Sequence, residues 1–536
     1  MEGACKGNQV ILKVSKWLKI TNRIFIGPPY SQFCKEVYFS TNMAYNNSMS
    51  KIYGQIKAII FTTLFIILHG VEFVRETAII NPVPVMHITG IIVLLISVIM
   101  LVPNIKEHIN RITLSNIKAN PLRSVIVVLW FEFTILATVS KSDYLWPIIY
   151  FLLFGFFYLI KLNAEEKNVL VKSFFLGNAI GFGLVQAFAY GFRPYDEARY
   201  KGPFVNSNIT GLYYTLVYII ILFLIHYLVK NKAKKIYIAL SVAAAAYLFA
   251  LIFITVGRTA LITAVLMTVI FFLLVVWRNW KLTFGKVILT GIIFLASIVI
   301  MFYPTYLSVR YLPGILHHPV WFHNEYSENK VHSFDPITSE KYISVGEMLS
   351  MFLGRNVKGF VSEEEYKNII ESKSDYIESV DIEKEQIVVA PDAIVESIEY
   401  EKGTPLQRLD RFSSNRLRIT ITYIRNLNCQ GHSSTQEVWI GERRIYNSQN
   451  IFLQPAWDFG IPAGIVFAIM AVLLWIYRIK QYINGKKNIY SVFPILIMAI
   501  FFIFGQLEVV WEYGMLILWL FFFAQHPMFE EISEDK

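Results

Sequence analysis

The sequence predicts an all-α integral membrane protein with about twelve transmembrane helices and one large external loop. Two observations carry this prediction. Of the 536 residues, 55% are hydrophobic and only 16% are charged, and apolar runs of about 17 to 22 residues recur along nearly the whole chain. A run of this length crosses roughly 30 Å of hydrocarbon as a helix, in which every backbone polar group is bonded internally. This composition argues against a soluble multidomain protein.

The apolar runs divide the chain into five parts. We predict twelve spans at residues 57–74, 86–103, 122–139, 143–160, 169–190, 208–229, 236–254, 258–277, 286–306, 457–477, 490–507 and 510–525. The predicted order is an amino-terminal cytoplasmic or interfacial segment, nine spans, a loop, three spans and a cytoplasmic tail, over residues 1–56, 57–306, 307–456, 457–525 and 526–536. The amino-terminal segment lacks the uninterrupted apolar core of a secretory signal peptide.

Loops rich in lysine and arginine alternate with loops that are poor in them. Basic residues of short loops stay on the cytoplasmic side of a membrane, so the rich loops are predicted to lie inside. Both termini are then cytoplasmic, and the 307–456 loop is external. The net charge of +10 fits this topology and contact with anionic lipids, and we expect no nucleic-acid partner.

Several kinds of chemistry find no support in the sequence. No His or Cys cluster has zinc-ligand spacing, and no glycine loop with a following Lys would cradle nucleotide phosphates. Cys5 and Cys34 fall on the inner side of the predicted topology and Cys429 on the outer side, so we expect no disulfide between them. We therefore expect no metal and no cofactor, and ATP-driven transport by this chain alone is not supported.

The 307–456 loop is the one large departure from the hydrophobic pattern. Within SEKYISVGEMLSMFLG, five apolar residues share one helical face. They are Ile343, Val345, Met348, Leu349 and Phe352. This helix is predicted to lie on the membrane or to cap the bundle. Residues 362–402 are strongly acidic, and we interpret them as a solvated excursion.

Unusual polar residues gather near the predicted outer ends of the spans, where such groups are costly. They are Arg193, Arg199, Lys201, Asn206, Asn208, Arg258, Arg416, Arg418, Gln449 and Asn450. Arginine presents five donors in a planar fork that suits phosphate oxygens, and it does not lose its charge. Arginines that converge where the bundle meets the outer leaflet would hold a lipid diphosphate. Gly202 in KGPF would let the backbone approach such a group.

Simpler roles exist for three of these residues. Asn206 or Asn208 can cap the sixth predicted helix, whose positive end would add to an anion site. For both asparagines, capping alone is an equally good interpretation. Arg258 opens the eighth predicted span in TVGRTA, and its side chain can simply reach from the span end to the membrane interface.

Three short motifs, in this order, resemble the O-antigen ligase and O-antigen polymerase superfamily. They are YKGPFVNSNITG, TVGRTALITAV at the start of a span, and NSQNIFLQPAWDFGIPAG at the end of the large loop. The resemblance covers about residues 120–525. Each motif is weak alone, and their order and topology carry the likeness.

The family's motifs correspond to particular residues of this chain. The first motif, an Arg shortly before Gly-x-Phe and Asn-Pro-Asn, corresponds to Arg199, Gly202, Phe204, Asn206 and Asn208, with Ser207 in place of the usual proline. The second, Ser-x-Ser-Arg-Thr, corresponds to Arg258 and Thr259. The third, His-Asn followed by Leu-Gln and Gly-Ile, corresponds to Asn450, Leu453, Gln454, Gly460 and Ile461, with Gln449 where the family often has histidine.

The resemblance implies a metal-independent glycosyltransferase of the bacterial cytoplasmic membrane, with a helical bundle similar to the GT-C membrane glycosyltransferases. Its donor would be a polyprenyl-diphosphate-linked oligosaccharide on the outer face, and its product a surface polysaccharide such as a capsule. Membrane lipids and other polysaccharide assembly proteins would be its partners. The predicted catalytic residues are Arg199, Arg258 and His432, and the predicted substrate-binding residues are Lys201, Gly202, Asn206, Asn208, Arg416, Arg418, Gln449 and Asn450.

The reaction also needs a base, because an acceptor hydroxyl must lose its proton. Family members are usually assigned a loop histidine for this role, and Gln449 cannot serve. Nearby candidates are His432, Glu437, Glu442 and Asp458. We select His432, with an idle exposed histidine as the simpler alternative.

Three other functions stay open. A ligase would transfer the lipid-linked glycan to a different surface acceptor. A flippase for lipid-linked oligosaccharides would also have about twelve spans, but its charges would line a path near the membrane midplane. A different membrane glycosyltransferase, with an acid in its first external loop, is suggested only by Glu72 and Glu76.

Overall fold

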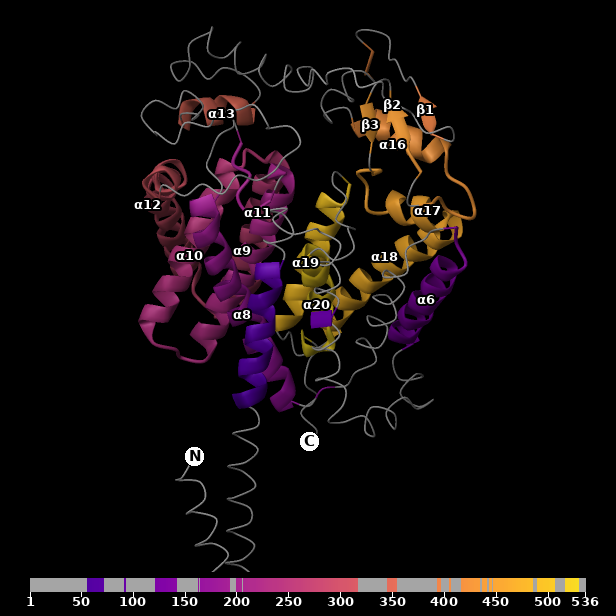
Figure 1. The fold of residues 1–536 in the computed structure, drawn as a ribbon. Helices are drawn as coiled ribbons and strands as arrows, with labels where there is room; N and C mark the ends of the chain where they lie inside the picture. The colour runs from indigo at the N-terminus through magenta and orange to yellow at the C-terminus, as the bar shows by residue number, and fades with distance from the viewer. Residues whose placement is uncertain are drawn as a thin grey trace, which may run out of the picture. The chain divides into compact units, whose positions relative to one another are not determined.

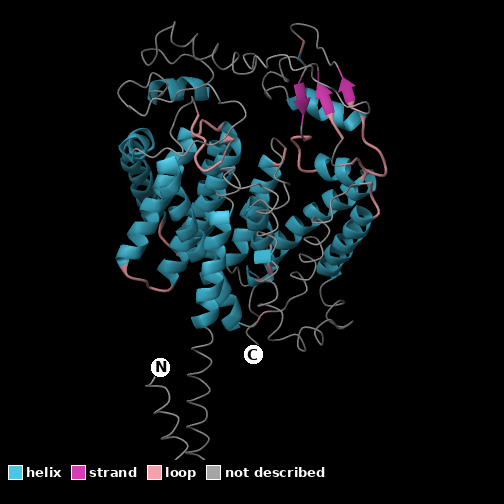
Figure 2. Ribbon diagram, in the orientation of Figure 1, coloured by secondary structure: helices cyan, strands magenta, loops and turns pink. Residues whose placement is uncertain are grey.

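A computed structural model gives the fold of the protein (Figure 1). It describes residues 55–71, 91–92, 121–141, 162, 164–192, 199–204, 206–316, 345–353, 393–396, 404–405, 416–433, 436–440, 443–445, 447–484, 489–506 and 516–529. The chain divides into two compact units, residues 1–60 and residues 61–536. Of the first unit, only the start of helix Gln55–Val71 is described. Helices account for most of the described residues (Figure 2).

Seven helices of the described ranges are long and apolar enough to cross a membrane. They are α6 (Pro121–Thr138), α8 (Ala164–Phe192), α9 (Ser207–Lys230), α10 (Lys235–Ile254), α11 (Arg258–Phe271) with its π-helical continuation η2 (Phe272–Asn279), α12 (Phe284–Leu316) and α18 (Ile461–Asn484). Shorter apolar helices are Gln55–Val71, α19 (Val492–Phe504) and α20 (Leu516–Ala524). This confirms a helical, multi-pass membrane protein. The predicted spans 143–160 and, except for 91–92, 86–103 lie outside the described residues, so twelve spans stay a prediction.

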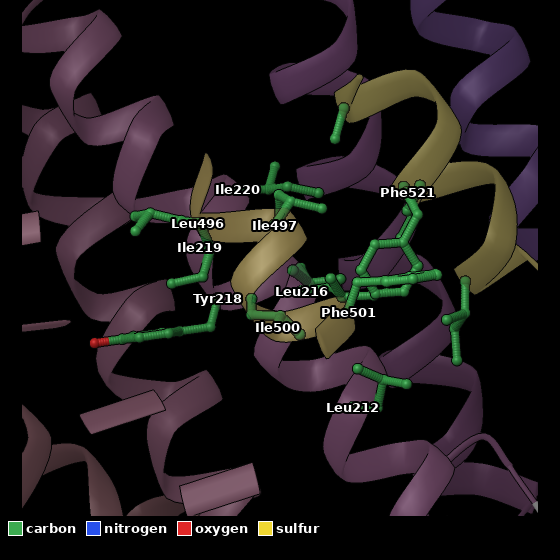
Figure 3. Close-up of a cluster of buried hydrophobic side chains, with 14 of the residues drawn as sticks. Leu212, Leu216, Tyr218, Ile219, Ile220, Leu496, Ile497, Ile500, Phe501 and Phe521 are labelled. Atoms are coloured by element: carbon green, nitrogen blue, oxygen red, sulfur yellow. The ribbon is translucent and has the colours of Figure 1, made fainter. Parts of the chain in front are cut away.

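Helix α9 is the central helix of the bundle. Its side chains from Thr210 to His226 are all buried, because α8, α10, α11 and α19 pack around it. Figure 3 shows Leu212, Leu216 and Ile220 of α9 with Leu496 and Phe501 of α19. A helix that is apolar on every side must have all of its faces covered by other helices or by lipid. Apart from Thr215 and its tyrosines, α9 carries its polar residues near its two ends.

The remaining long helices have more exposed surface. α12 packs along α10 and leaves most of its apolar side chains exposed. α6 packs against α18 in a pair that α17 (Leu453–Phe459) also contacts. After α20, the short 3-10 helix η4 (Pro527–Phe529) returns into the aromatic core, where Phe529 packs against Phe493 with ring centroids 4.8 Å apart. Exposed apolar faces of this kind are suited to lipid acyl chains.

Two helices differ in their bounds from the predicted spans. Helix α12 continues beyond residue 306, the predicted end of the ninth span, to Leu316, and Val309 in this extension is buried. The tenth span was predicted as one helix over 457–477. The chain instead forms α17, turns at Gly460 with φ of 94°, and starts α18 at Ile461.

The predicted loop contains helices and a small sheet. α13 (Val345–Leu353) confirms the amphipathic helix, and Phe352 stacks on Phe253 of α10 with ring centroids 6.1 Å apart. α13 therefore packs against one end of the bundle, as Figure 1 also shows. The acidic segment 362–402 lies outside the described residues except for 393–396.

Three short strands in the loop were not predicted from the sequence. β1 (Ile394–Glu396) pairs in parallel with β2 (Val438–Ile440), which pairs antiparallel with β3 (Arg443–Ile445). Val438 stands opposite Ile394 and Ile445 in the two registers. The sheet covers α16 (Arg416–Arg425) and α17 through a small second core. Its buried members are Ile419, Tyr423, Val438, Ile445, Leu453 and Trp457.

Candidate functional site

Arg199 joins the start of α9 to the turn between the end of α10 and the start of α11. Its Nη2 donates to Oδ1 of Asn208 in the first turn of α9 at 2.6 Å. Its Nε donates to the carbonyl oxygen of Thr255, between α10 and α11, at 3.0 Å. Both acceptors are neutral groups, and the two bonds fix the guanidinium plane.

The residues after Arg199 form a tight turn against the bundle. Gly202 has φ of 55°, in the left-handed region that favours glycine. A Cβ at this position would collide with the Tyr214 hydroxyl. Thr210 donates to the carbonyl oxygen of Lys201, which closes the turn onto α9. Gly202 is therefore required by the turn and its packing, which is a different role from the backbone approach expected from the sequence.

The two asparagines of the first motif have different roles. Asn206 is the N-cap of α9, and its side-chain oxygen accepts from the backbone N–H of Asn208 at 2.8 Å. Asn208 turns its own side-chain oxygen to Arg199. Capping thus explains Asn206, and positioning of an arginine explains Asn208.

Arg258 is the first residue of α11, after the N-cap Gly257. The residue before this cap, Val256, has φ of 51°. A β-branched side chain rarely adopts this conformation, because its Cβ approaches the following carbonyl. Such strain persists only where the surrounding structure enforces it. Arg258 is exposed and directly follows the Thr255–Gly257 turn in the chain. Arg199 is half-buried and donates to the carbonyl oxygen of Thr255 in the same turn.

Three helix ends of opposite polarity meet near Arg199. The positive ends of α9 and α11 lie there, and neither helix has an acidic residue in its first turn. Acidic side chains are the usual stabilising choice at such positions. In α11 the first residue is Arg258, and in α9 the first turn is contacted by Arg199. The Thr255 carbonyl that Arg199 bonds belongs to the negative C-terminal end of α10. We name Arg199, Lys201, Asn206, Asn208 and Arg258 the Arg199 cluster.

A second group of predicted residues lies in the return segment, residues 416–460. Arg416, the first residue of α16, donates from Nε to Oε1 of Gln449 at 3.2 Å. Gln449 has φ of 51°. The Asn450 side chain accepts from the backbone N–H groups of Phe452 and Leu453 at 2.9 and 3.1 Å, and so supports the start of α17. Arg416, Gln449 and Asn450 form the Gln449 cluster.

The structure places Arg418 on α16, two residues beyond Arg416, with a half-buried side chain. The contacts described for the predicted residues thus form two clusters, one at the starts of α9 and α11 and one in the return segment. Arg193 lies outside the described residues.

His432 is held by the return segment. Its ring stacks on Trp457 with centroids 3.7 Å apart and an interplanar angle of 16°. Nε2 lies 2.9 Å from the carbonyl oxygen of Asn426 and 3.0 Å from Nδ2 of Asn428. A neutral ring that donates from Nε2 to the Asn426 carbonyl keeps the lone pair of Nδ1 available, whereas a ring that accepts from Nδ2 of Asn428 carries its proton on Nδ1. Within the described ranges, no hydrogen bond occupies Nδ1.

The protonation of His432 follows from its surroundings. Partial burial lowers the pKa of His432 below its usual 6.5, a backbone hydrogen bond to Asn426 raises it, and the nearby charge of Lys141 lowers it. The net shift is downward, so the ring is neutral at neutral pH and able to accept a proton.

The other candidate bases have structural bonds. Glu437 pairs with Arg444 at 3.0 Å and accepts from Nε1 of Trp439 at 2.9 Å. Asp458 is buried and accepts from Nε2 of Gln454 at 2.9 Å. Glu442 lies outside the described residues. These bonds leave His432 the best-placed candidate base among the described residues.

Sequence reasoning missed the residues beneath the Arg199 cluster. Gln186 of α8 is buried and bonds Tyr200 and Tyr214. The available signal was an amide inside a mostly apolar span, and Asn178 of the same span gives the same signal. The Thr255 carbonyl was also missed, because a backbone acceptor leaves no mark in a sequence.

No group of three or more His, Cys, Asp or Glu residues suited to a metal ion occurs in the described part of the chain. Comparisons of the chain with protein-family models, curated proteins and solved structures gave no match. The functional interpretation therefore rests on the residues and their geometry, together with the motif resemblance.

Proposed function

We propose that the protein polymerises polyprenyl-diphosphate-linked oligosaccharide repeats into a surface polysaccharide, without a metal ion. One observation carries the proposal: the Arg199 guanidinium lies where α9 and α11 begin, and neither helix has an acid in its first turn. Two positive helix ends and two arginines suit a doubly charged leaving group. The three motifs that resemble O-antigen polymerases and ligases support the same reaction.

In the proposed step, an acceptor sugar hydroxyl attacks the anomeric carbon of the donor repeat. The new bond joins the acceptor oxygen to this carbon, and the bond between the carbon and the diphosphate oxygen breaks. The electron pair leaves with the diphosphate, whose growing charge Arg199 and Arg258 stabilise. Interactions that strengthen as the bond breaks accelerate the reaction, whereas equal binding of substrate and transition state does not. The hydroxyl proton goes to Nδ1 of His432.

The direct test supplies purified protein in lipid with one substrate, a polyprenyl-diphosphate oligosaccharide repeat. We expect a ladder of longer lipid-linked glycans without nucleotide sugar, ATP or divalent metal. Polymerisation is favoured over ligation because one substance then serves as donor and acceptor. A ladder that needs a second acceptor glycan would identify a ligase, and unchanged substrate that only crosses the bilayer would identify a flippase.

A further inference from the structure

A buried amide lies directly beneath the turn that carries Arg199. Gln186 of α8 donates from Nε2 to the Tyr200 hydroxyl at 3.0 Å. Its Oε1 accepts from the Tyr214 hydroxyl of α9 at 2.7 Å. All three side chains are buried, and Tyr200 directly follows Arg199 in the chain.

Two more tyrosines complete this polar group. The hydroxyls of Tyr190 in α8 and Tyr247 in α10 contact each other, and both interact with Gln186. One amide thus connects α8, α9 and α10 with the Tyr200 turn. Polar groups inside a membrane bundle are costly unless bonded, and here they meet below the charged turn.

The Tyr214 hydroxyl has a second contact that matters. It occupies the space next to Gly202, where any Cβ would collide with it. In the Tyr200–Gly202 turn, Gly202 packs against the Tyr214 hydroxyl, and the Tyr200 hydroxyl accepts a hydrogen bond from Gln186. The backbone N–H of Tyr200 also donates to the carbonyl oxygen of Ile254 at 3.3 Å, next to the acceptor of Arg199.

We propose that Gln186 is a positioning residue for the anion site: it holds Tyr200 and Tyr214 so that Arg199 stays between the starts of α9 and α11. The inference rests on the proposed function, because it assigns the support of the same diphosphate site. Gln186 does not touch the anion in this proposal. It acts through Tyr200 and the turn.

The test measures binding of a polyprenyl diphosphate that carries no sugar, to purified protein in lipid nanodiscs. Gln186→Met keeps the side-chain volume and removes both hydrogen bonds. We expect about tenfold weaker binding, the loss typical of about one to two buried hydrogen bonds. Tyr200→Phe should weaken binding by a similar or smaller factor, and the double variant should be no weaker than Gln186→Met alone.

Thr268→Val is the matched control. Thr268 of α11 lies 2.5 Å from the hydroxyl of Tyr218, which is one helical turn beyond Tyr214 on α9. The substitution removes a bundle hydrogen bond to a tyrosine but leaves the Tyr200 turn untouched. It should reduce thermal stability in the same direction as Gln186→Met and leave diphosphate affinity unchanged.

The outcomes separate the two proposals. Weaker binding in Arg199→Ala with unchanged binding in Gln186→Met and Tyr200→Phe would overturn the positioning role and leave the anion site standing. Unchanged binding in Arg199→Ala would overturn the anion site itself. If Gln186→Met does not fold, Tyr200→Phe decides. Additive losses in the double variant would also overturn the inference, since Gln186 would then not act through Tyr200.

Discussion

The Arg199 cluster and the Gln449 cluster have the same parts in different surroundings. Each pairs an arginine with a neutral amide near a helix start, at 2.6 Å for Arg199 and Asn208 and at 3.2 Å for Arg416 and Gln449. Arg199 has a second bond, to the backbone carbonyl of Thr255 between α10 and α11, which both pack against the buried helix α9. The Gln449 cluster lies in the loop region, on short helices and strands.

This difference suggests a division of work in the proposed reaction. A charge that must stabilise a leaving group has to stay in place, because a preorganised site has no reorganisation cost as the reaction proceeds. The bundle provides that fixed support for Arg199. The return segment holds a neutral histidine and amides, which suit recognition and deprotonation of a sugar acceptor.

The strongest test of this comparison is Arg199→Ala. We expect polymer formation to fall by about 10² to 10³, the loss typical when a donor to developing charge is removed. Arg199→Lys should recover only part of the rate, because an ammonium supplies charge without the bidentate fork. Initial rates of ladder formation measure both variants. Full activity of Arg199→Ala in folded protein would contradict the proposed leaving-group role.

His432→Gln tests the chemical role of the return segment. Loss of a general base should lower the rate about 10²-fold. Because the folded pKa of His432 lies below 6.5, the wild-type rate should fall on acidification only at pH values below 6.5. A pH profile measures this acid limb, which should be absent in His432→Gln. An unchanged limb in the variant would assign the titration to another group.

The same pKa shift predicts an effect on stability. At pH values near and below 6.5, His432 binds a proton more readily in the unfolded chain than in the folded chain. The contribution of His432 to the free energy of unfolding is therefore complete above pH 6.5 and is lost on acidification. Unfolding midpoints of the wild-type protein and His432→Gln at several pH values measure it. Equal acid sensitivity of the two proteins would exclude the contribution.

Glycine substitutions compare the rigidity of the two regions. At Gly460, with φ of 94°, a Cβ would meet the Cys429 backbone carbonyl, whereas at Gly202 it would meet the end of the Tyr214 side chain. We expect Gly460→Ala to lower the free energy of unfolding by about 3 kcal/mol and Gly202→Ala by about 1–2 kcal/mol. Tyr214→Phe should recover part of the second loss. Chemical denaturation in detergent measures these changes, and a larger loss at Gly202 would reverse the comparison.

The smallest effects are expected in the Gln449 cluster. Arg416→Ala should reduce polymer formation about tenfold, and Gln449→Ala about threefold, since both variants lose the hydrogen bond between Arg416 and Gln449 and the first also removes a charge. Initial rates at saturating and limiting substrate separate a binding loss from a rate loss. A loss in Arg416→Ala as large as that in Arg199→Ala would mean that both arginines hold the leaving group.

The sequence predicts the bundle well because hydropathy and span length have direct physical causes. It also places a cap at the start of α9, where Asn206 binds a backbone N–H. It does not predict the strands at 394–396 and 438–440, because three residues are too few for a period-two pattern. Contacts between residues far apart in the sequence are also not predicted. The hydrogen bonds of Gln186 to Tyr200 and Tyr214 depend on how the helices pack, and no local sequence pattern records this.

The length of α12 couples the protein to the membrane that surrounds it. At about 1.5 Å per residue, its 33 residues extend about 50 Å, against a hydrocarbon layer of about 30 Å. A helix of this length tilts in such a layer or projects beyond it, and its exposed residues Ile288, Leu295 and Val299 are suited to contact with acyl chains. Because α12 packs along α10, whose C-terminal end holds the Thr255 carbonyl, we expect bilayer thickness to set the tilt of this helix pair beside the proposed anion site.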